Sequence, residues 1–520
     1  MKMSTTHRIA QVCTLWALLP MAGILTTASS VLMDSRVTAG ETRYVVRILS
    51  YHPDSVVPRR IYSGTCVFNG QRKIFASLTT KTTTSDATQG MIVSADVDAA
   101  GAVSGFTQQV FPSCKEMNGI VATPNCSTVV AMCRRPAGST GASRDLVAEL
   151  PGNATGNDWR NWLTAEPTDD QMWLYEWKGN PAMPVAGASA FQSYVVSKAI
   201  GGGWEYGHQS IVLGSTHYGI SMKSTTRKDG GGIQHQGDSF VAVNRFAPAI
   251  DTSRGWRWAC ATGHTLANRA TVSSAGKFSA LCTTDWNGKS GAESNGAIWM
   301  RVEDRSAALV HAVYNSRNYS LVFNGGGTSI LPLADGGYIG VIAGSDNPGI
   351  AEPTKIGLAR FNSDGGMQSF RWVASDGAYW LSYPQLSPLG NDVNGAPRYL
   401  LGWGRMMPTA TSTLENVNPD QTQRLATQYF VQEIDQYGEP KTSAREVIHG
   451  WGEQDQMISL GSGMVGWVYT PDPRYRLPLP TPNSTSLQWT TYKSSASFEK
   501  GVRPTIYRPA AFEERFQRRR

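Results

Sequence analysis

Short apolar runs, separated by polar and Gly-rich turns, recur along most of the chain. The run "YIGVIAGSD" begins at Tyr338, and weak copies of it begin at Lys73, Thr128, His217, Phe278, Tyr399 and Met464. These runs are short and rich in β-branched and aromatic residues, which predicts strands rather than helices. The last five copies are spaced by 61, 60, 61 and 65 residues. Such a period is typical of propellers, solenoids and arrays.

Each copy has partner strands in its unit. An apolar run precedes it, and a third strand such as "IGLARFNSDGG" or "FVQEIDQYGEP" follows it before a fourth. In three units Asp98, Asp364 and Asp435 sit near a Gly, which suits a tight hairpin turn because Gly accepts a positive φ. Four antiparallel, hairpin-linked strands form the blade of a β-propeller, so the prediction is an all-β fold with seven blades.

The two ends of the repeat complete each other. After residues 464–470 only the run 486–493 remains, so the last blade lacks one strand, whereas the strand 43–51 has no blade of its own. If the N-terminal strand fills the last blade, the ring closes without an exposed edge. Over residues 40–495 the chain therefore resembles the seven-bladed β-propeller superfamily.

This resemblance is one of architecture and implies no activity. Gly207-His208 and Gly263-His264 are similar to the Gly-His dipeptide of WD40 repeats, but no Trp-Asp pair ends the blades. The segment 362–370, "NSDGGMQSF", matches the Asp-box of sialidase propellers only in part.

The segments outside the repeat indicate export. Residues 1–33 place Lys2 and Arg8 before an apolar run and small residues, the order of a secretory signal peptide. We expect a secreted, extracellular protein without a membrane span after signal removal, the alternative being an uncleaved signal anchor. Residues 496–520 form a basic tail that we expect to be disordered.

Composition narrows the function classes. Charged residues make up 17% of the chain, and Gly (53) and Trp (16) are abundant, as in a protein of short strands and turns. The formal charge of +7 is spread over scattered Lys and Arg residues. No basic face with interleaved aromatic residues stands out, so a nucleic-acid partner is not expected.

Cysteines and sequons agree with export. Six cysteines remain after signal removal, and an even number in an exported chain predicts disulfides. We expect Cys260 and Cys282 to join adjacent blades; Cys126 and Cys133 either bracket one hairpin, or Cys114 takes one of them. Their spacing is not that of a C-x-x-C metal site, and no metal or cofactor is expected. Possible glycosylation sites are Asn125, Asn153, Asn318 and Asn483.

The residues that lead into the first strand of each blade are the candidate ligand site. In a propeller the first strand lines the channel, so these residues converge at one mouth. The candidates are Trp204, His208, His264, Tyr319, Trp380, Glu453 and Asp455. Trp204 and Trp380 lie in Gly-rich turns, where an exposed ring can stack on a sugar. The alternative for His208 and His264 is a structural role between neighbouring loops.

Three functions fit this sequence. The first is a binding or scaffold module for an extracellular glycan or protein partner. The second is a carbohydrate-active enzyme, a glycoside hydrolase or lyase, with carboxylates such as Glu205, Glu453 and Asp455 facing each other across the mouth. The third is a purely structural extracellular component, for which large exposed apolar patches would argue.

Overall fold

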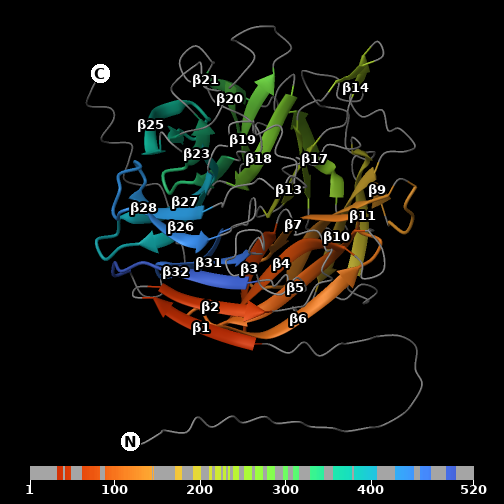
Figure 1. The fold of residues 1–520 in the computed structure, drawn as a ribbon. Helices are drawn as coiled ribbons and strands as arrows, with labels where there is room; N and C mark the ends of the chain where they lie inside the picture. Colours follow the sequence, from red (N-terminus) through yellow and green to blue (C-terminus); the bar gives the residue numbers. More distant parts are fainter. Residues whose placement is uncertain are drawn as a thin grey trace, which may run out of the picture.

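The computed structural model describes residues 32–38, 41–47, 61–81, 88–136, 138–142, 144–145, 170–178, 191–200, 210–213, 217–223, 227–229, 232–234, 238–244, 251–259, 264–272, 278–286, 297–302, 309–314, 328–344, 355–376, 380–406, 428–449, 457–469 and 488–498. In these ranges every regular element is a β-strand (Figure 1). No helix long and apolar enough to cross a membrane occurs in them.

Within the described ranges, seven sheets of three to five strands follow one another along the chain. The first contains β3 (Tyr62–Phe68), β4 (Gln71–Lys81), β5 (Thr88–Val97) and β6 (Val103–Phe111). The second contains β7 (Glu116–Ala122), β8 (Thr128–Arg135), β10 (Asp170–Lys178), β11 (Phe191–Ile200) and β9 (Arg144–Asp145). The strand β9 pairs parallel to β11, and all other pairs are antiparallel.

The next two sheets lie in the middle of the chain. The third contains β12 (Ser210–Leu213), β13 (His217–Lys223), β16 (Asp238–Asn244) and β17 (Asp251–Ala259), with a small hairpin of β14 (Arg227–Asp229) and β15 (Gly232–Gln234). The fourth contains β18 (His264–Val272), β19 (Phe278–Trp286), β20 (Ala297–Val302) and β21 (Leu309–Tyr314).

Three further sheets and a terminal hairpin complete the fold. The fifth sheet contains β22 (Thr328–Pro332), β23 (Tyr338–Gly344), β24 (Lys355–Phe361) and β25 (Met367–Ser375). The sixth contains β26 (Trp380–Asn391), β27 (Pro397–Met406), β28 (Gln428–Asp435) and β29 (Arg445–His449). The seventh contains β30 (Met457–Gly461), β31 (Met464–Tyr469) and β32 (Gln488–Lys493), and β1 (Leu32–Thr38) pairs with β2 (Glu41–Arg47).

The burial of each strand explains the repeated sequence pattern. Every aligned run is the second strand of its sheet, as predicted. All residues of β23 and β31 are buried, so these strands need apolar residues on both faces. The fourth strand β25 is mostly exposed or half-buried and carries a more polar sequence. The second strand therefore carries the most recognisable repeat.

The core lies between neighbouring sheets. The first strand of each sheet contacts that of the next, from β3 to β7, β12, β18, β22, β26 and β30, and β30 in turn contacts β3. One buried cluster joins the first and seventh sheets, another the first and second, and others the fifth to the sixth and the sixth to the seventh. Packing of sheet face against sheet face thus supplies the hydrophobic core.

The terminal strands adjoin the seventh sheet. This sheet has three strands, as predicted, and β2 lies against β32 (Figure 1). The predicted strand 43–51 corresponds to β2, which begins and ends earlier, and its partner β1 was not predicted. Polar and charged residues dominate β1, "LMDSRVT", so no apolar run marks it.

A five-residue turn recurs at the hairpins. Its first residue is Asp98, Asn362, Asp392 or Asp435, and the Oδ1 atom of that residue accepts hydrogen bonds from the backbone N–H groups two and four residues later. The fourth residue is a glycine with φ between 75° and 88°. The prediction that Asp98, Asp364 and Asp435 lie near a turn glycine of positive φ is confirmed; in the third unit Asn362 occupies the first position of the turn and Asp364 the third.

Two disulfides lie in the first two sheets. Cys66 on β3 pairs with Cys126 in the β7–β8 turn, and Cys114 pairs with Cys133 on β8. Cys126 and Cys133 therefore do not pair with each other; the alternative, in which Cys114 takes one of them, is confirmed. The physical reason is that β3 packs on the second sheet and brings Cys66 to the hairpin. Of the other expected pair, Cys260 lies outside the described residues.

Candidate functional site

Each sheet has two different ends. Turns join the first strand to the second and the third to the fourth at what we call the hairpin end. The second strand leads to the third, and the fourth to the next sheet, at the opposite end, the connection end. The antiparallel strand order of the sheets fixes this division.

The hairpin ends of five sheets lie on the same side of the molecule. Between the first and second sheets, the N–H of Val67 donates to Pro124 O at 2.8 Å. Between the first and seventh sheets, Gly101 in the β5–β6 turn lies against Met464, which begins β31 directly after the β30–β31 turn. Between the sixth and seventh sheets, the N–H of Gly463 donates to Leu389 O at 2.9 Å. Between the fifth and sixth sheets, the guanidinium of Arg360 lies 4.8 Å from the ring centroid of Tyr437.

The connection ends of the same sheets therefore also lie together, and the long segments between strands attach there. The turns at the hairpin end comprise a few residues, such as 69–70, 98–102 and 392–396. The segments between second and third strands are longer, namely 345–354, 407–427 and 470–487. Binding residues concentrate on long segments carried by a regular scaffold, so the connection end is the candidate functional side.

Two of the predicted ligand residues begin first strands. His264 is the first residue of β18, and Trp380 is the first residue of β26, so their backbones stand at the connection end of the fourth and sixth sheets. Five others lie outside the described residues: Trp204, His208, Tyr319, Glu453 and Asp455.

Among the predicted glycosylation sites, Asn125 is exposed in the β7–β8 turn at the hairpin end, and its Oδ1 accepts from the N–H of Ser127 at 3.1 Å. Asn153, Asn318 and Asn483 lie outside the described residues. An exposed sequon is sterically open to a glycan.

A group of aromatic and cationic side chains occupies the connection end of the second sheet. The guanidinium of Arg135 lies 4.0 Å above the ring of Trp173, whose Nε1 donates to Gln171 Oε1 at 3.0 Å. Tyr175 stacks on Phe111, with ring centroids 5.5 Å apart. Burial raises the pKa of Tyr175, and contacts with Arg135 and Ser113 offset part of this shift. The Cys114–Cys133 disulfide holds the two segments that carry this group.

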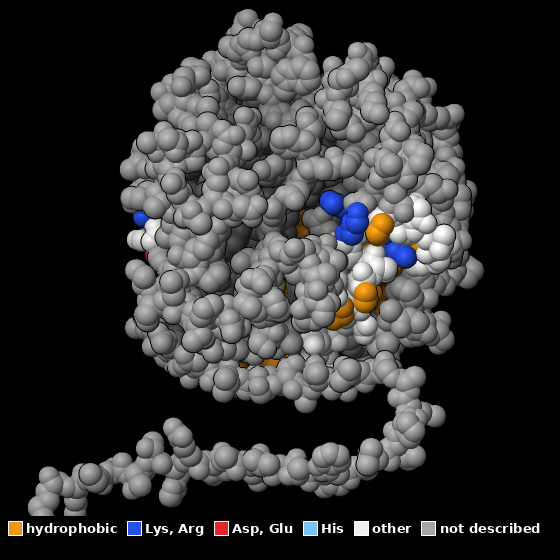
Figure 2. Space-filling view, turned by 45° about the vertical axis from the view of Figure 1, so that its right-hand side comes forward, with side chains coloured by type: hydrophobic (Ala, Val, Ile, Leu, Met, Phe, Trp, Pro, Cys, Tyr) orange, Lys and Arg blue, Asp and Glu red, His pale blue; other side chains and the backbone are white. Residues whose placement is uncertain are grey.

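Two more basic residues adjoin it. Arg134 precedes Arg135 at the end of β8, and the N–H of Lys115 donates to Arg134 O at 2.7 Å. All three basic side chains are partly exposed. Figure 2, which brings forward the side that carries β6, β10 and β11 in Figure 1, shows Lys and Arg side chains beside hydrophobic and polar ones. We call Lys115, Arg134, Arg135, Trp173 and Tyr175 the second-sheet cluster.

A series of polar side-chain contacts lies at the connection end of the sixth sheet. Arg405 Nε lies 2.9 Å from Asp376 Oδ2, and its guanidinium lies 5.4 Å from the ring centroid of Phe430. Arg405 Nη1 also donates to Gln428 Oε1, while Gln428 Nε2 donates to Glu446 Oε2 at 2.9 Å. Asp376 is thus ion-paired with Arg405, and Glu446 accepts a hydrogen bond from Gln428.

These two groups combine hydrogen-bond donors with aromatic rings. Guanidinium groups bind carboxylate and other oxyanion groups. The rings of Trp173 and Tyr175 are buried, so in the second-sheet cluster they support Arg135, and the basic groups are what a ligand can reach. In the described ranges no group of three or more His, Cys, Asp or Glu residues is placed to hold a metal ion.

The sequence did not single out the second-sheet cluster. Trp173 is one of 16 tryptophans in the chain, and its side chain is fully buried. The adjacent pair Arg134-Arg135, at the end of a second strand, is the one signal in the sequence that could have located the cluster.

No protein-family model matches the chain. No curated protein matches it either. Similar solved structures include an ulvan lyase of a new polysaccharide lyase family, 9% identical, with a TM-score of 0.38 over 71% of this chain and 78% of that one.

Two other similar structures come from named organisms. The α-L-arabinofuranosidase of Fusarium graminearum, in complex with an iminosugar inhibitor, is 8% identical, with a TM-score of 0.36 over 86% of this chain and 96% of that one. AofleA of Arthrobotrys oligospora is 7% identical, with a TM-score of 0.34 over 76% of this chain and 89% of that one. At these values the likenesses assign neither a family nor an activity to this chain.

Proposed function

We propose that the chain is a secreted seven-bladed β-propeller that binds an extracellular glycan at its connection end. The seven sheets are the blades, and the N-terminal strand β2 completes the seventh. The cyclic series of contacts from β3 through β30 and back to β3 supports the ring, because it leaves no end sheet without a neighbour. Two disulfides in the first two sheets are consistent with export.

One observation supports this location of the binding site. First strands that contact one another in a ring begin close to a common axis, so the residues at their starts converge. Trp380 and His264 occupy two of these starts. In this proposal Trp380 stacks on a sugar ring, and Trp204, His208, Tyr319, Glu453 and Asp455 complete the mouth of the channel. A concave site where aromatic and polar groups converge is the usual setting of a small-ligand site.

The enzyme alternative makes a stricter demand. A glycoside hydrolase needs two carboxylates that face each other across the bound sugar. At the described connection end, Asp376 is ion-paired with Arg405 and Glu446 accepts from Gln428. These contacts favour a structural role for both groups, and the carboxylates of the enzyme alternative, Glu205, Glu453 and Asp455, lie outside the described residues. Binding needs no facing pair of carboxylates, so binding is the function that we propose.

A glycan-array screen of the full-length secreted protein tests the proposal. The wild type is compared with Trp380→Ala, with His264→Ala and with Tyr437→Ala, a control on the same sheet whose ring is 54% exposed at the hairpin end. Loss of a stacking ring is expected to weaken binding about tenfold or more. Tyr437→Ala is expected to bind as the wild type does.

Two results would contradict the proposal. One is a wild-type protein that binds no glycan on the array; the other is equal binding by the wild type and Trp380→Ala. Circular dichroism and thermal unfolding of each variant separate a lost contact from a lost fold.

A further inference from the structure

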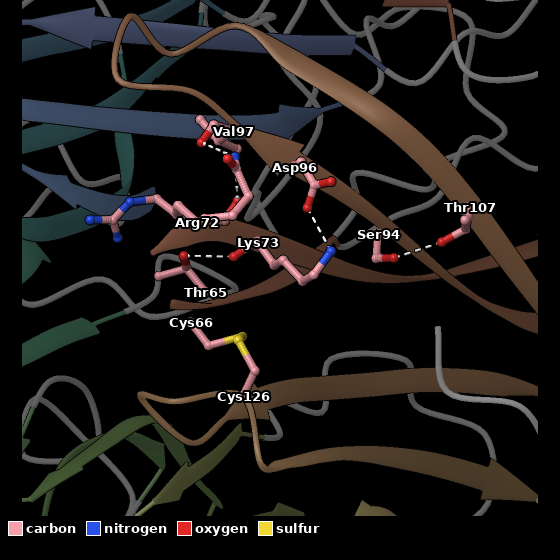
Figure 3. A network of polar contacts seen from close by, with 10 residues as sticks. Thr65, Cys66, Arg72, Lys73, Ser94, Asp96, Val97, Thr107 and Cys126 are labelled. Atoms are coloured by element: carbon pink, nitrogen blue, oxygen red, sulfur yellow. Dashed lines mark hydrogen bonds and ion pairs between the residues drawn. A yellow bond between two sulfur atoms is a disulfide. The ribbon is translucent and has the colours of Figure 1, made fainter. Parts of the chain in front are cut away.

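The seam between the first and seventh sheets holds an unusual arginine at its hairpin end. Arg72 lies next to the first residue of β4, and its side chain is half-buried. Figure 3 shows its guanidinium pointing away from Lys73 and toward the blue strands near the C-terminal end of the chain. The Nη2 atom is 3.7 Å from the position that a Cβ of Gly461 would take. The guanidinium therefore faces the β30–β31 hairpin.

No carboxylate in the described part of the chain pairs with Arg72. Of the two acidic residues at the end of the neighbouring strand β5, Asp96 is engaged by Lys73 Nζ at 2.6 Å (Figure 3). Asp98 Oδ1 accepts from the N–H groups of Ala100 and Ala102. Burial lowers the pKa of Arg72, as expected for a cation that loses water without gaining an anion.

The sixth sheet shows what this position looks like when it is paired. Arg398 lies next to the first residue of β27, as Arg72 does in β4. Its Nε lies 3.1 Å from Oδ2 of Asp392, which begins the five-residue turn before β27. In the first sheet a two-residue turn at 69–70, Asn-Gly, replaces this turn, so the acidic partner is missing.

A second cation faces the same seam. Trp489 packs in the cluster shared by the first and seventh sheets, and Thr491 contacts Gly101 of the first sheet. Because side chains alternate along a strand, Lys493 lies on the same face of β32. It is paired in register with Met464, directly after the β30–β31 hairpin, and it is exposed. Lys493 has no ion pair within the described residues.

We propose that this seam binds a tetrahedral oxyanion, sulfate or phosphate, either free or attached to a larger molecule. Arg72 supplies the planar pair of donors from the first sheet, and Lys493 supplies an ammonium group from the seventh. The anion takes the place that the Asp392 carboxylate has beside Arg398. This site lies at the hairpin end and is independent of the glycan site proposed above.

Calorimetric titration of the full-length protein tests this site. Sodium sulfate is added at constant ionic strength, with chloride as the balancing anion, and the experiment is repeated with inorganic phosphate and with a sulfated disaccharide. We expect saturable binding of sulfate or phosphate by the wild type. Tighter binding of the disaccharide would indicate a group carried on a larger ligand, and equal binding a free ion.

Three variants locate the anion. Arg72→Gln is expected to weaken binding about tenfold or more, because a charge-assisted hydrogen bond is lost. Lys493→Gln is expected to weaken it less. The control is Lys441→Gln, which is expected to bind as the wild type does. It removes an equal charge from an exposed residue that is ion-paired with Asp435 in the sixth sheet.

The proposal fails if the wild type shows no saturable binding of either anion, or if Arg72→Gln binds as tightly as the wild type. Arg72→Gln is expected to fold, since it breaks no ion pair in the described residues. Thermal unfolding in chloride checks this directly. Sulfate also stabilises proteins by exclusion from their surface, and Lys441→Gln measures that general effect.

Discussion

At the scale of the residue, the first position of each five-residue turn shows how one side chain holds a hairpin. In their separate turns, Asn362 and Asp392 each accept hydrogen bonds through Oδ1 from the backbone N–H groups two and four residues later. An amide therefore satisfies the turn as well as a carboxylate does. An aspartate also carries a negative charge, which adds stability where a cation lies beside it, as Arg398 lies beside Asp392.

Asp392→Asn is therefore expected to keep the turn and lose the ion pair. Burial by itself would raise the pKa of Asp392, but the N–H groups of Ala396 and Asn394 and the charge of Arg398 lower it on balance. A lowered pKa in the folded state means that the carboxylate stabilises the fold above its unfolded pKa of about 3.9. This contribution is lost as the pH falls through the lower, folded pKa.

Chemical unfolding at a series of pH values measures the effect. At pH 7 the variant is expected to be less stable than the wild type by roughly 1 kcal/mol, and the difference should shrink in acid. Asp98→Asn, in a turn of the same geometry where the aspartate makes no ion pair within the described residues, controls for the amide itself. A difference that stays constant from pH 7 to pH 2 would refute this account.

At the scale of the element, the turns also join neighbouring sheets. Gly101 of the first sheet lies against Met464 and Thr491 of the seventh, and Gly438 of the sixth lies against Leu358 and Val373 of the fifth. The same kind of contact thus joins the sixth sheet to the fifth and the first sheet to the seventh. Its occurrence at these two boundaries is consistent with the proposed ring of sheets.

Gly438→Ala tests the energetic value of this contact. The residue has φ +79°, and an added Cβ would lie 2.9 Å from Val373 Cγ1. Gly395→Ala is the matched control, with φ +75° and no atom within 4 Å of the added Cβ.

Both variants carry backbone strain, of about 1–3 kcal/mol. Gly438→Ala is expected to lose more free energy of unfolding than Gly395→Ala, because only it disturbs the neighbouring sheet. Equal losses in urea unfolding would show that the turn does not contribute to the contact between sheets.

The elements show which parts of the fold can be predicted from a sequence. Second strands such as β23 and β31 are buried on both faces, so their long apolar runs are recognisable. The strand β1 and the short β9 carry no such run, because charged and polar residues dominate them. Periodicity therefore finds buried strands and misses peripheral ones.

The candidate site could be predicted only in part. The starts of first strands follow from the repeat, so the positions of Trp380 and His264 could be inferred. The stacking of Arg135 on Trp173 joins two strands that are distant in sequence, and the Cys66–Cys126 disulfide joins two sheets. Such contacts depend on how strands pair and sheets pack, which one sequence does not reveal.

At the scale of the whole molecule, the N-terminal hairpin should be needed for a stable ring. The strand β2 pairs with β1 and lies against β32, the last strand of the seventh sheet, whose edge it would cover in the proposed ring. A protein that lacks residues 1–47 is expected to unfold at a lower temperature and to aggregate more readily than one that lacks only residues 1–31. Differential scanning calorimetry and light scattering compare the two, and equal transition temperatures would argue against the proposed closure.

The measurement that tests the central claim most directly is hydrogen–deuterium exchange of the full-length protein, alone and saturated with a glycan identified on the array. The account predicts that the glycan slows exchange at the starts of first strands, including residues 264–267 and 380–383. It predicts no change in the turns 98–102, 362–366 and 435–439. Protection of those turns, with unchanged exchange at the starts of β18 and β26, would place the ligand at the hairpin end and contradict the account.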